Sequence, residues 1–351
     1  MTNSTSIHTK LRYVSSPCGS GKTTALCNMI NKELHIQGSA EKFIIVQNTQ
    51  KLANQTAKDI DNCEVIISTS KNRKKNVINS VLDFLKYPTK RALIITDKTF
   101  FRIPVELLQG WQIWLDDVTN FHSYKCINDS SSWVKGIIYN ELMQEHEIVD
   151  GGTGKYLTAK KKNVKGDILY KIPKELSVIG ENDIFIMNND YFYEPDKVQL
   201  NILGWIDLNK YIGLPITFMG ANFENSLIYK ANLSLFEKAD LEGLLTRTTP
   251  LNERLKVYYF SNKKKLSKGW KDNNYEKLNN VYDYLDAELK GQGFYWTNNE
   301  KDKHKLQQGT RISPDARGHN DYKDRHTCVW SACLRPDDTE AKLFELLFKI
   351  T

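Results

Sequence analysis

The chain has 351 residues, which suits two domains of ordinary size or one domain with a large insertion. Its 49 lysines and arginines against 42 aspartates and glutamates give a formal charge of +7, which permits a polyanionic partner without requiring one. With 40% hydrophobic and 26% charged residues the chain can bury a core, which excludes a disordered or collagen-like protein. Its apolar runs have the length of strands and its N-terminus lacks the pattern of a secretory signal, so we expect a cytoplasmic protein with no membrane partner.

From residue 11 onward, short apolar segments alternate with helical periodicity, a pattern typical of α/β units on a parallel sheet. Apolar residues recur every three or four positions over residues 22–34, which predicts a helix directly after a glycine-rich turn. The pattern loosens between residues 133 and 180, so we predict an insertion or exposed loop at about residues 130–185. The buried strands expected for this part of the chain are at residues 13–14, 43–46, 65–67, 93–95, 113–115 and 216–219.

Threonines, one proline and charged residues interrupt this rhythm at residues 241–254. They predict a linker between a first domain at residues 1–240 and a second at residues 255–351. The second domain has only about a hundred residues, so we expect it to be short or incomplete. Its predicted elements are strands at residues 257–260, 294–296 and 327–330 and a helix near residues 275–289.

The strongest motif is Ser-Pro-Cys-Gly-Ser-Gly-Lys-Thr-Thr at residues 16–24, which follows a strand and opens a helix, as a P-loop does. Its glycines let backbone N–H groups wrap a phosphate chain, and the helix N-terminus adds its positive end. Lys22 would reach the β- and γ-phosphates of ATP, and the Thr23 hydroxyl would bind Mg²⁺. The residues expected to hold the nucleotide are Pro17, Cys18, Gly19, Ser20, Gly21, Lys22, Thr23 and Thr24.

A site of this kind needs a carboxylate at the end of a neighbouring buried strand, and Asp116 and Asp117 follow such a strand. Asp116 would bind Mg²⁺ together with Thr23, and Asp117 would act as general base for the attacking water. The run Gly-Thr-Gly-Lys at residues 152–155 imitates a P-loop, but Tyr156 replaces the required Ser or Thr. We therefore predict a plain loop there.

These motifs resemble those of superfamily-two DEAD/DEAH-box helicases. Residues 43–55 are similar to helicase motif Ia, with Asn48 in place of the family's proline, and residues 116–119 are similar to the DEAD/DEAH box. Residues 217–222 resemble motif III and residues 316–320 resemble motif V. The resemblance implies a P-loop NTPase of the α/β class, with RecA-like parallel sheets in two domains and ATP hydrolysed in the cleft between them.

Two features depart from the family pattern. Asp117 stands where the family has Glu, which shortens the carboxylate arm by one methylene and predicts slow hydrolysis. Motif VI, whose arginine completes the ATP site in the family, is not recognisable after motif V. Either Arg317, Arg325 or Arg335 replaces that arginine, or a partner protein or a C-terminal extension supplies it.

The resemblance also implies that the chain grips the sugar-phosphate backbone of nucleic acid, and we favour DNA over RNA. The leading hypothesis is an ATP-dependent helicase or translocase. One alternative is an ATP-binding switch or assembly subunit that hydrolyses weakly and needs a partner, and another is a P-loop kinase acting on a small molecule. The predicted nucleic-acid contacts are Thr49, Gln55, Thr96, Lys98, Arg317 and Asn320.

Composition adds three smaller expectations. The abundance of Asn, Lys and Tyr indicates an AT-rich coding source, such as a phage or a bacterial mobile element, and hence a host cytoplasm. Six cysteines without zinc-like spacing indicate reduced thiols. Trp111, Trp114 and Trp330 lie on strand-like runs, which predicts core positions rather than platforms for bases.

Overall fold

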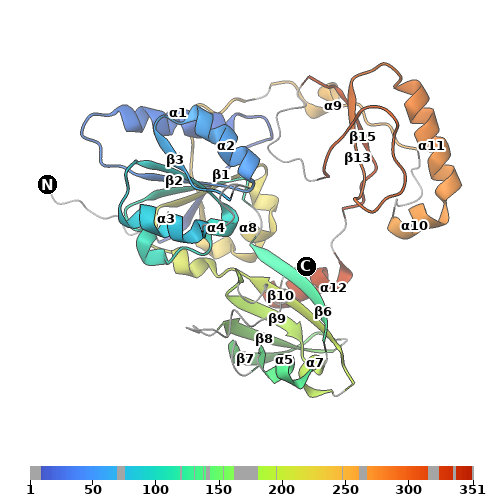
Figure 1. Cartoon of the computed structure of the whole chain (residues 1–351), viewed down its shortest axis with the longest axis horizontal. Coiled ribbons are helices and arrows are strands. Elements are labelled where there is room, and N and C mark those ends of the chain that lie inside the picture. Colours follow the sequence, from blue (N-terminus) through green and yellow to red (C-terminus); the bar gives the residue numbers. More distant parts are fainter. Residues whose placement is uncertain are drawn as a thin grey trace. The chain divides into compact units, whose positions relative to one another are not determined.

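The chain divides into two units (Figure 1). Unit 1 is formed by Met1–Thr246 together with Asp337–Thr351, and unit 2 is formed by Arg247–Pro336. In the part of the chain that is described, no helix has both the length and the apolar character needed to cross a bilayer. The computed structural model describes residues 9–68, 76–118, 121–129, 131–136, 138–139, 143–152, 154–161, 181–194, 196–246, 248–260, 267–314, 324–334 and 337–349.

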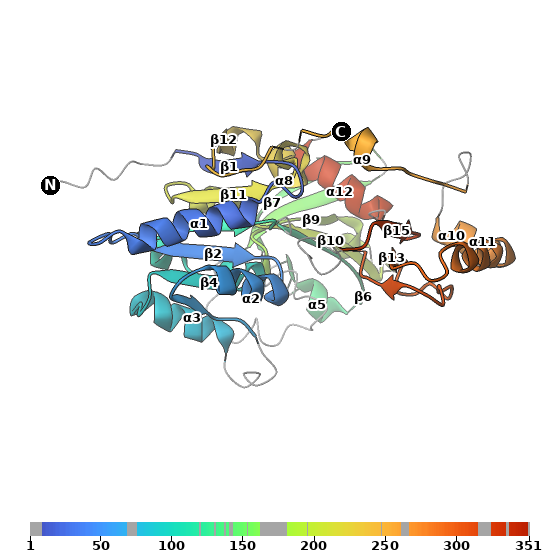
Figure 2. The same cartoon turned by 90° about the horizontal axis from the view of Figure 1, so that it is seen from above.

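Unit 1 is built on a seven-stranded sheet, sheet A, in which the neighbouring strands run parallel. Because parallel strands end at one edge, the loops that follow them gather there. Figure 2 shows β12, β1, β11, β2 and β4 in this order across the sheet. In spatial order the strands are β12 (Phe236–Lys238), β1 (Leu11–Ser15), β11 (Ile216–Gly220), β5 (Gln112–Asp116), β2 (Phe43–Gln47), β4 (Ala92–Thr96) and β3 (Cys63–Val65). The expected α/β class with a parallel sheet is confirmed.

Helices cover both faces of sheet A (Figure 1). Alternate residues of β2 serve the two faces, because successive side chains of a strand point to opposite sides. Ile44 and Val46 join a core cluster with α3, and Phe43 and Ile45 join a second cluster with α1 and α2. The helices of this part are α1 (Lys22–His35), α2 (Gln50–Asp59), α3 (Val77–Lys86), α4 (Asp97–Phe100) and α8 (Leu227–Ala231), with short 3₁₀ turns η2 (Val105–Leu108), η6 (Leu208–Tyr211), η7 (Phe223–Asn225) and η8 (Leu233–Leu235).

A second, antiparallel sheet, sheet B, is inserted between β5 and β11. Its strands in spatial order are β6 (His122–Asn128), β10 (Gln199–Trp205), β9 (Ile184–Asn188), β8 (Lys155–Lys161) and β7 (Met143–Asp150), and it carries the short helices α5 (Ser132–Gly136) and α7 (Asp190–Tyr193). The insertion was expected at about residues 130–185, but sheet B begins and ends well outside those bounds. Gly152 and Gly154 lie between β7 and β8, where Gly151 N–H donates to the Gly154 carbonyl at 2.9 Å, as the predicted loop requires, whereas Lys155 begins β8.

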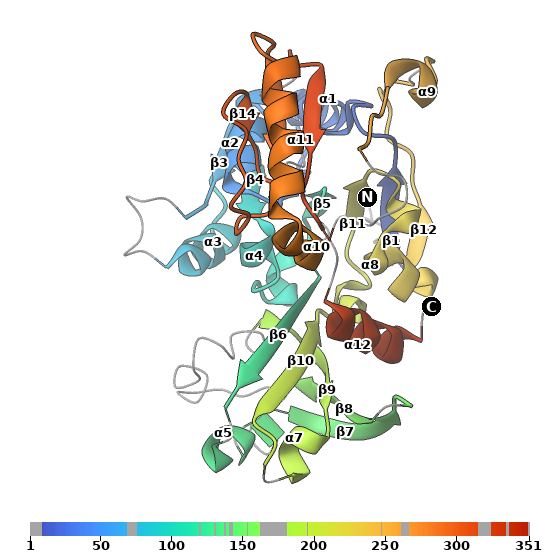
Figure 3. The same cartoon turned by 90° about the vertical axis from the view of Figure 1, so that its right-hand side faces the viewer.

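The last helix, α12 (Asp338–Phe348), packs on sheet B within unit 1 (Figure 3). Asp337 caps it by accepting from the Thr339 N–H at 2.8 Å. The Phe344 ring lies edge-on to Trp205, with ring centroids 5.8 Å apart. The second domain was expected to extend over residues 255–351. Helix α12 instead belongs to unit 1, because an apolar face of this helix is buried against the insertion.

Unit 2 contains a small parallel sheet with one long helix beside it. Leu278 and Tyr282 of the helix are buried together with Phe294 and Trp296 of the central strand. The predicted helix near residues 275–289 is confirmed. The elements of unit 2 are α9 (Leu251–Arg254), α10 (Lys268–Asn273), α11 (Tyr275–Glu288), β13 (Phe294–Thr297), β14 (Thr310–Arg311) and β15 (Thr327–Trp330), with the strands in the order β14-β13-β15.

Two expectations for this part were wrong. Residues 257–260 form no strand, and Val257 and Phe260 are mostly exposed. Trp330 is 55% exposed, because alternate residues of β15 face solvent, whereas Trp111 and Trp114 are buried as predicted.

Candidate nucleotide-binding site

The P-loop connects β1 to α1 at the carboxyl edge of sheet A. Gly21, at the N-cap of α1, has φ of 76°, a left-handed conformation that a side chain would strain. Ser16 N–H donates to the Gly220 carbonyl at 3.2 Å, which ties the start of the loop to the end of β11. Lys22 is buried, and its ammonium donates to the carbonyls of Ser16 at 3.1 Å and Pro17 at 3.3 Å. The lysine thus lies folded against its own loop.

The side chains of Thr23 and Asp116 contact each other next to this loop. Thr23 Oγ1 donates to Asp116 Oδ2 at 2.6 Å, although the two residues come from different strand-helix units. Asp116 is only 4% exposed, and burial, together with the neighbouring charge of Asp117, raises its pKa to about 6. Hydrogen bonds from Thr23 and Gln47 and the charge of Lys22 oppose that rise. The structure therefore brings the two predicted metal-binding side chains together.

The donor set fits a magnesium ion bound with a nucleotide. Asp116 Oδ1 is buried and has no hydrogen-bond partner within the described ranges, so this carboxylate keeps an acceptor for a cation. A hydroxyl and one carboxylate are few ligands, but Mg²⁺ in nucleotide sites takes its other ligands from water and phosphates.

Asp117 has an unusual backbone conformation. Its φ is 51°, in the left-handed region that Asp tolerates better than most residues, and its N–H donates to the Met219 carbonyl at 2.9 Å. The end of β11, predicted as motif III, thus hydrogen-bonds both Asp117 and the P-loop. Such strain commonly occurs at functional sites.

The sequence analysis did not identify Gln47. This side chain is buried at the end of β2, where it pairs in register with Asp116 of β5. Its Nε2 donates to Asp116 Oδ2 at 3.1 Å and to Thr56 Oγ1 of α2 at 2.8 Å. The sequence does contain a signal for this role, since Gln47 directly continues the apolar run 43–46. A polar side chain at such a position is expected to be buried, and a buried amide needs hydrogen-bond partners.

A second carboxylate, also missed, contacts the strand that precedes the P-loop. Ser15 Oγ donates to Glu224 and accepts from the Phe223 N–H at 3.0 Å. Partial burial acts to raise the pKa of Glu224, but the Ser15 hydrogen bond and other interactions outweigh it and lower the pKa. Glu224 therefore helps to hold the last residue of β1 beside η7.

Three predicted nucleic-acid contacts, Thr49, Thr96 and Lys98, lie at the same carboxyl edge, and the fourth, Gln55, lies on the helix that starts there. Thr49 caps α2, where its Oγ1 accepts from the Leu52 N–H at 3.2 Å, and Gln55 is half-buried on the same helix. Thr96 ends β4, which neighbours β2, and Lys98 follows it with an exposed side chain. Arg317 and Asn320 lie outside the described residues.

Of the three arginines that could complete the ATP site, Arg325 lies within the described residues. Arg325 Nη1 donates to the Phe294 carbonyl at 2.8 Å and to Thr310 Oγ1 at 2.7 Å, which fastens its guanidinium to the strands of unit 2. Arg317 and Arg335 lie outside the described residues.

Comparison with known proteins adds an independent finding. Residues 3–110 match the family model described as "Type III restriction enzyme, res subunit", a stretch that holds the P-loop and Thr49 but not Asp116. A solved structure titled "Structure of S. tokodaii Xpd4" is similar at 12% sequence identity, over 87% of this chain and 76% of that one, with a TM-score of 0.37. No curated protein matches the chain. Because this TM-score is low, the structural likeness carries no argument, and the P-loop α/β class rests on the match over residues 3–110 and on the parallel sheet A.

Proposed function

We propose that this chain is an ATP-dependent nucleic-acid helicase or translocase. The observation that carries the proposal is the hydrogen bond from Thr23 Oγ1 to Asp116 Oδ2. It joins the P-loop to a carboxylate 93 positions later, as a magnesium-dependent nucleotide site requires. The match of residues 3–110 to the res subunit of type III restriction enzymes supports the motor over the kinase alternative.

The chain's own residues have distinct roles in this proposal. Bound Mg²⁺ would neutralise charge on the transferring phosphoryl group, and Thr23 and Asp116 would hold it. Lys22 would exchange the carbonyls of Ser16 and Pro17 for phosphate oxygens. Asp117 would orient the attacking water and accept its proton, over an arm shorter than that of Glu, so we expect slow turnover.

Nucleic acid would lie along the carboxyl edge of sheet A. Thr49, Gln55, Thr96 and Lys98 present hydroxyl, amide and ammonium donors there, which suit phosphate contacts without base specificity. DNA remains favoured over RNA, and the interdomain cleft and the cytoplasmic location remain predictions.

The switch or assembly subunit remains the second candidate, and Arg325 favours it. Because the guanidinium is fastened to Phe294 and Thr310, it is already committed to a structural role. Arg317, Arg335 or a partner protein would then supply the arginine that neutralises charge on the γ-phosphate.

The deciding experiment measures ATP hydrolysis by the full chain alone and with single-stranded DNA, duplex DNA or RNA, beside Lys22→Ala. A motor gives a low basal rate that one nucleic acid stimulates, and its affinity for that nucleic acid falls with rising salt. ATP binding without stimulation would identify the switch, and a rate that only a small-molecule acceptor raises would identify the kinase. Absence of ATP binding would refute all three.

A further inference from the structure

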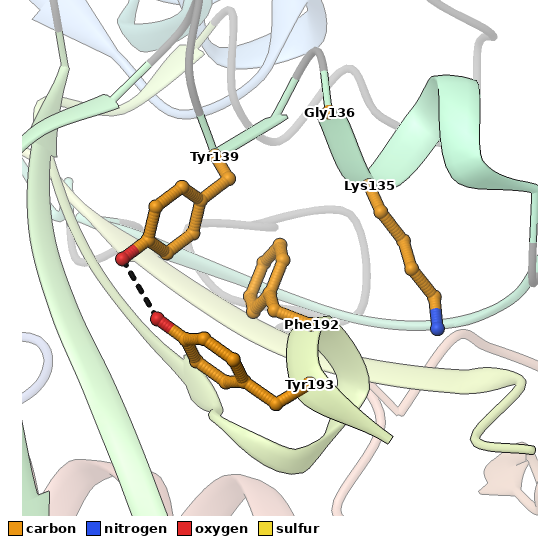
Figure 4. Close-up of a pocket in the computed structure, with 5 residues that line it drawn as sticks. All are labelled: Lys135, Gly136, Tyr139, Phe192 and Tyr193. Atoms are coloured by element: carbon orange, nitrogen blue, oxygen red, sulfur yellow. Dashed lines mark hydrogen bonds between the residues drawn. The ribbon is translucent and has the colours of Figure 1, made fainter. Parts of the chain in front are cut away.

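The insertion carries a small aromatic cavity that plays no part in the nucleotide site. Its volume is about 170 Å³, and it is lined by Lys135, Gly136, Tyr139, Phe192 and Tyr193 (Figure 4). Lys135 and Gly136 end α5, and Phe192 and Tyr193 end α7. Two separate segments of the chain therefore contribute its walls.

The rings of the cavity are held in fixed positions. The Tyr139 and Tyr193 hydroxyls are 2.8 Å apart and hydrogen-bonded, and their rings lie edge to face with centroids 6.1 Å apart. Phe192 lies beside them, 5.4 Å from Tyr139 between centroids. Tyr139 and Phe192 also pack on the core of the insertion, whereas Tyr193 is 59% exposed. The exposed Tyr193 ring is thus held by Tyr139, which Phe192 contacts in turn.

Lys135 extends on the other side of Phe192 (Figure 4). Its ammonium donates to the Glu194 carbonyl at 3.2 Å and lies 4.9 Å from the centre of the Tyr191 ring. An ammonium has three N–H donors, so this contact leaves donors for a further acceptor. Asp190, at the start of α7, pairs with Lys197 at 2.7 Å, so the charges of these two side chains offset each other.

We infer that this cavity binds one unpaired base of a single-stranded nucleic acid, between Phe192 and Tyr193, with Lys135 near the adjoining phosphate. The inference rests on the proposed function, which brings such a strand to unit 1. Aromatic rings stack on any base, and the paired hydroxyls offer hydrogen bonds to its edge. The volume is well below the roughly 300–1,000 Å³ of pockets for drug-sized ligands, so it suits a single planar ring.

The test compares two strands of equal length, a short oligothymidylate and the same strand built from abasic sites, in anisotropy titrations at one salt concentration. The variants are Tyr193→Ala, Tyr139→Phe and, as a matched control, Tyr87→Ala. Tyr87 is 80% exposed in unit 1 and lines no part of this cavity. Since Tyr193 and Tyr87 are both mostly exposed, neither change should alter the thermal transition.

We expect Tyr193→Ala to weaken binding of the base-bearing strand by about fivefold to a hundredfold and to leave the abasic strand unaffected. Tyr139→Phe should weaken it less, because the ring stays and only its hydrogen bond to Tyr193 is lost. Equal weakening on both strands, or none on either, would overturn the inference while leaving the proposed function intact. Failure of the unaltered protein to bind either strand would refute the nucleic-acid function itself.

Discussion

The buried Asp116 carboxylate should cost the nucleotide-free protein stability at neutral pH, so we expect Asp116→Asn to stabilise it. Burial raises the pKa of Asp116 from 3.8 to about 6, and the charge of Asp117 contributes to the rise. A carboxyl with a raised folded-state pKa contributes its full stability below pH about 4, and this contribution is lost as pH rises through about 6. Above that pH the protein must keep a charge that is desolvated and incompletely hydrogen-bonded.

The size of the effect follows from the pKa shift. About two pKa units correspond to about 3 kcal/mol of unfolding free energy at pH values above about 7. Asparagine keeps the size of the side chain and can present its oxygen to Thr23 and Gln47. Its amide nitrogen then takes the place of Oδ1, which has no partner within the described residues. One buried polar atom without a partner thus replaces another, and the main change is the loss of the negative charge.

The assay is amide hydrogen exchange in peptides of β2 and β5, with a metal chelator present and no nucleotide. Because both strands belong to unit 1, their exchange rates report the unfolding of unit 1 separately from that of unit 2. Comparing variant with unaltered protein at each pH removes the contribution of titrating groups that do not interact with Asp116. Exchange should be similar at pH about 4 and up to about a hundredfold slower in Asp116→Asn at pH about 8. A gap that does not change with pH, or a variant less stable at pH about 8, would refute the reasoning.

Three further predictions test neighbouring features. Lys22→Ala should abolish binding of a fluorescent ATP analogue with little change in unfolding, because alanine keeps the helix; unchanged affinity would contradict the P-loop assignment. Gln47→Leu should leave Asp116 and Thr56 without their shared donor, lower the unfolding free energy by about 1–3 kcal/mol and weaken Mg²⁺-dependent ATP binding. Thr56→Val is the matched control, and equal Mg²⁺ dependence in both variants would show that Gln47 acts only on packing. Arg325→Ala should destabilise unit 2 without changing turnover per folded molecule; a lower rate at equal stability would show that Arg325 acts at the phosphates.

The P-loop could be predicted because its chemistry is local. Glycines that permit a positive φ, followed at once by a helix, define the loop before any tertiary contact forms. The position of Asp116 beside the loop was predictable for a similar reason, since it ends an apolar strand. The role of Gln47 depends on the pairing of β2 with β5, which joins residues far apart in sequence and is not encoded in either strand alone.

Sheet B could not be anticipated for a different reason. Its strand β6 is half-exposed at several positions, with only Ile127 buried, so it lacks the continuous apolar run that marks the strands of sheet A. The packing of α12 on sheet B could not be predicted either, because Phe344 contacts Trp205, which lies far from it in the sequence. Residues 257–260 show the converse error, since an apolar run predicted a strand that the fold does not use.

The hydrogen bonds of Gln47 also give a physical route between the two proposed binding regions. The α2 helix carries Thr49 and Gln55, which we propose contact nucleic acid, and it also carries Thr56, which accepts from Gln47 at 2.8 Å. Gln47 in turn donates to Asp116 at 3.1 Å. A shift of α2 that lengthened the hydrogen bond between Gln47 and Thr56 would let the Gln47 amide rotate. Asp116 would then lose a hydrogen-bond donor that stabilises its charged form. Nucleic acid bound at α2 would in this way alter the binding of Mg²⁺ through two hydrogen bonds. Loss of stimulation in Gln47→Leu at saturating Mg²⁺ and ATP, with the basal rate retained, is the measurement that tests such coupling.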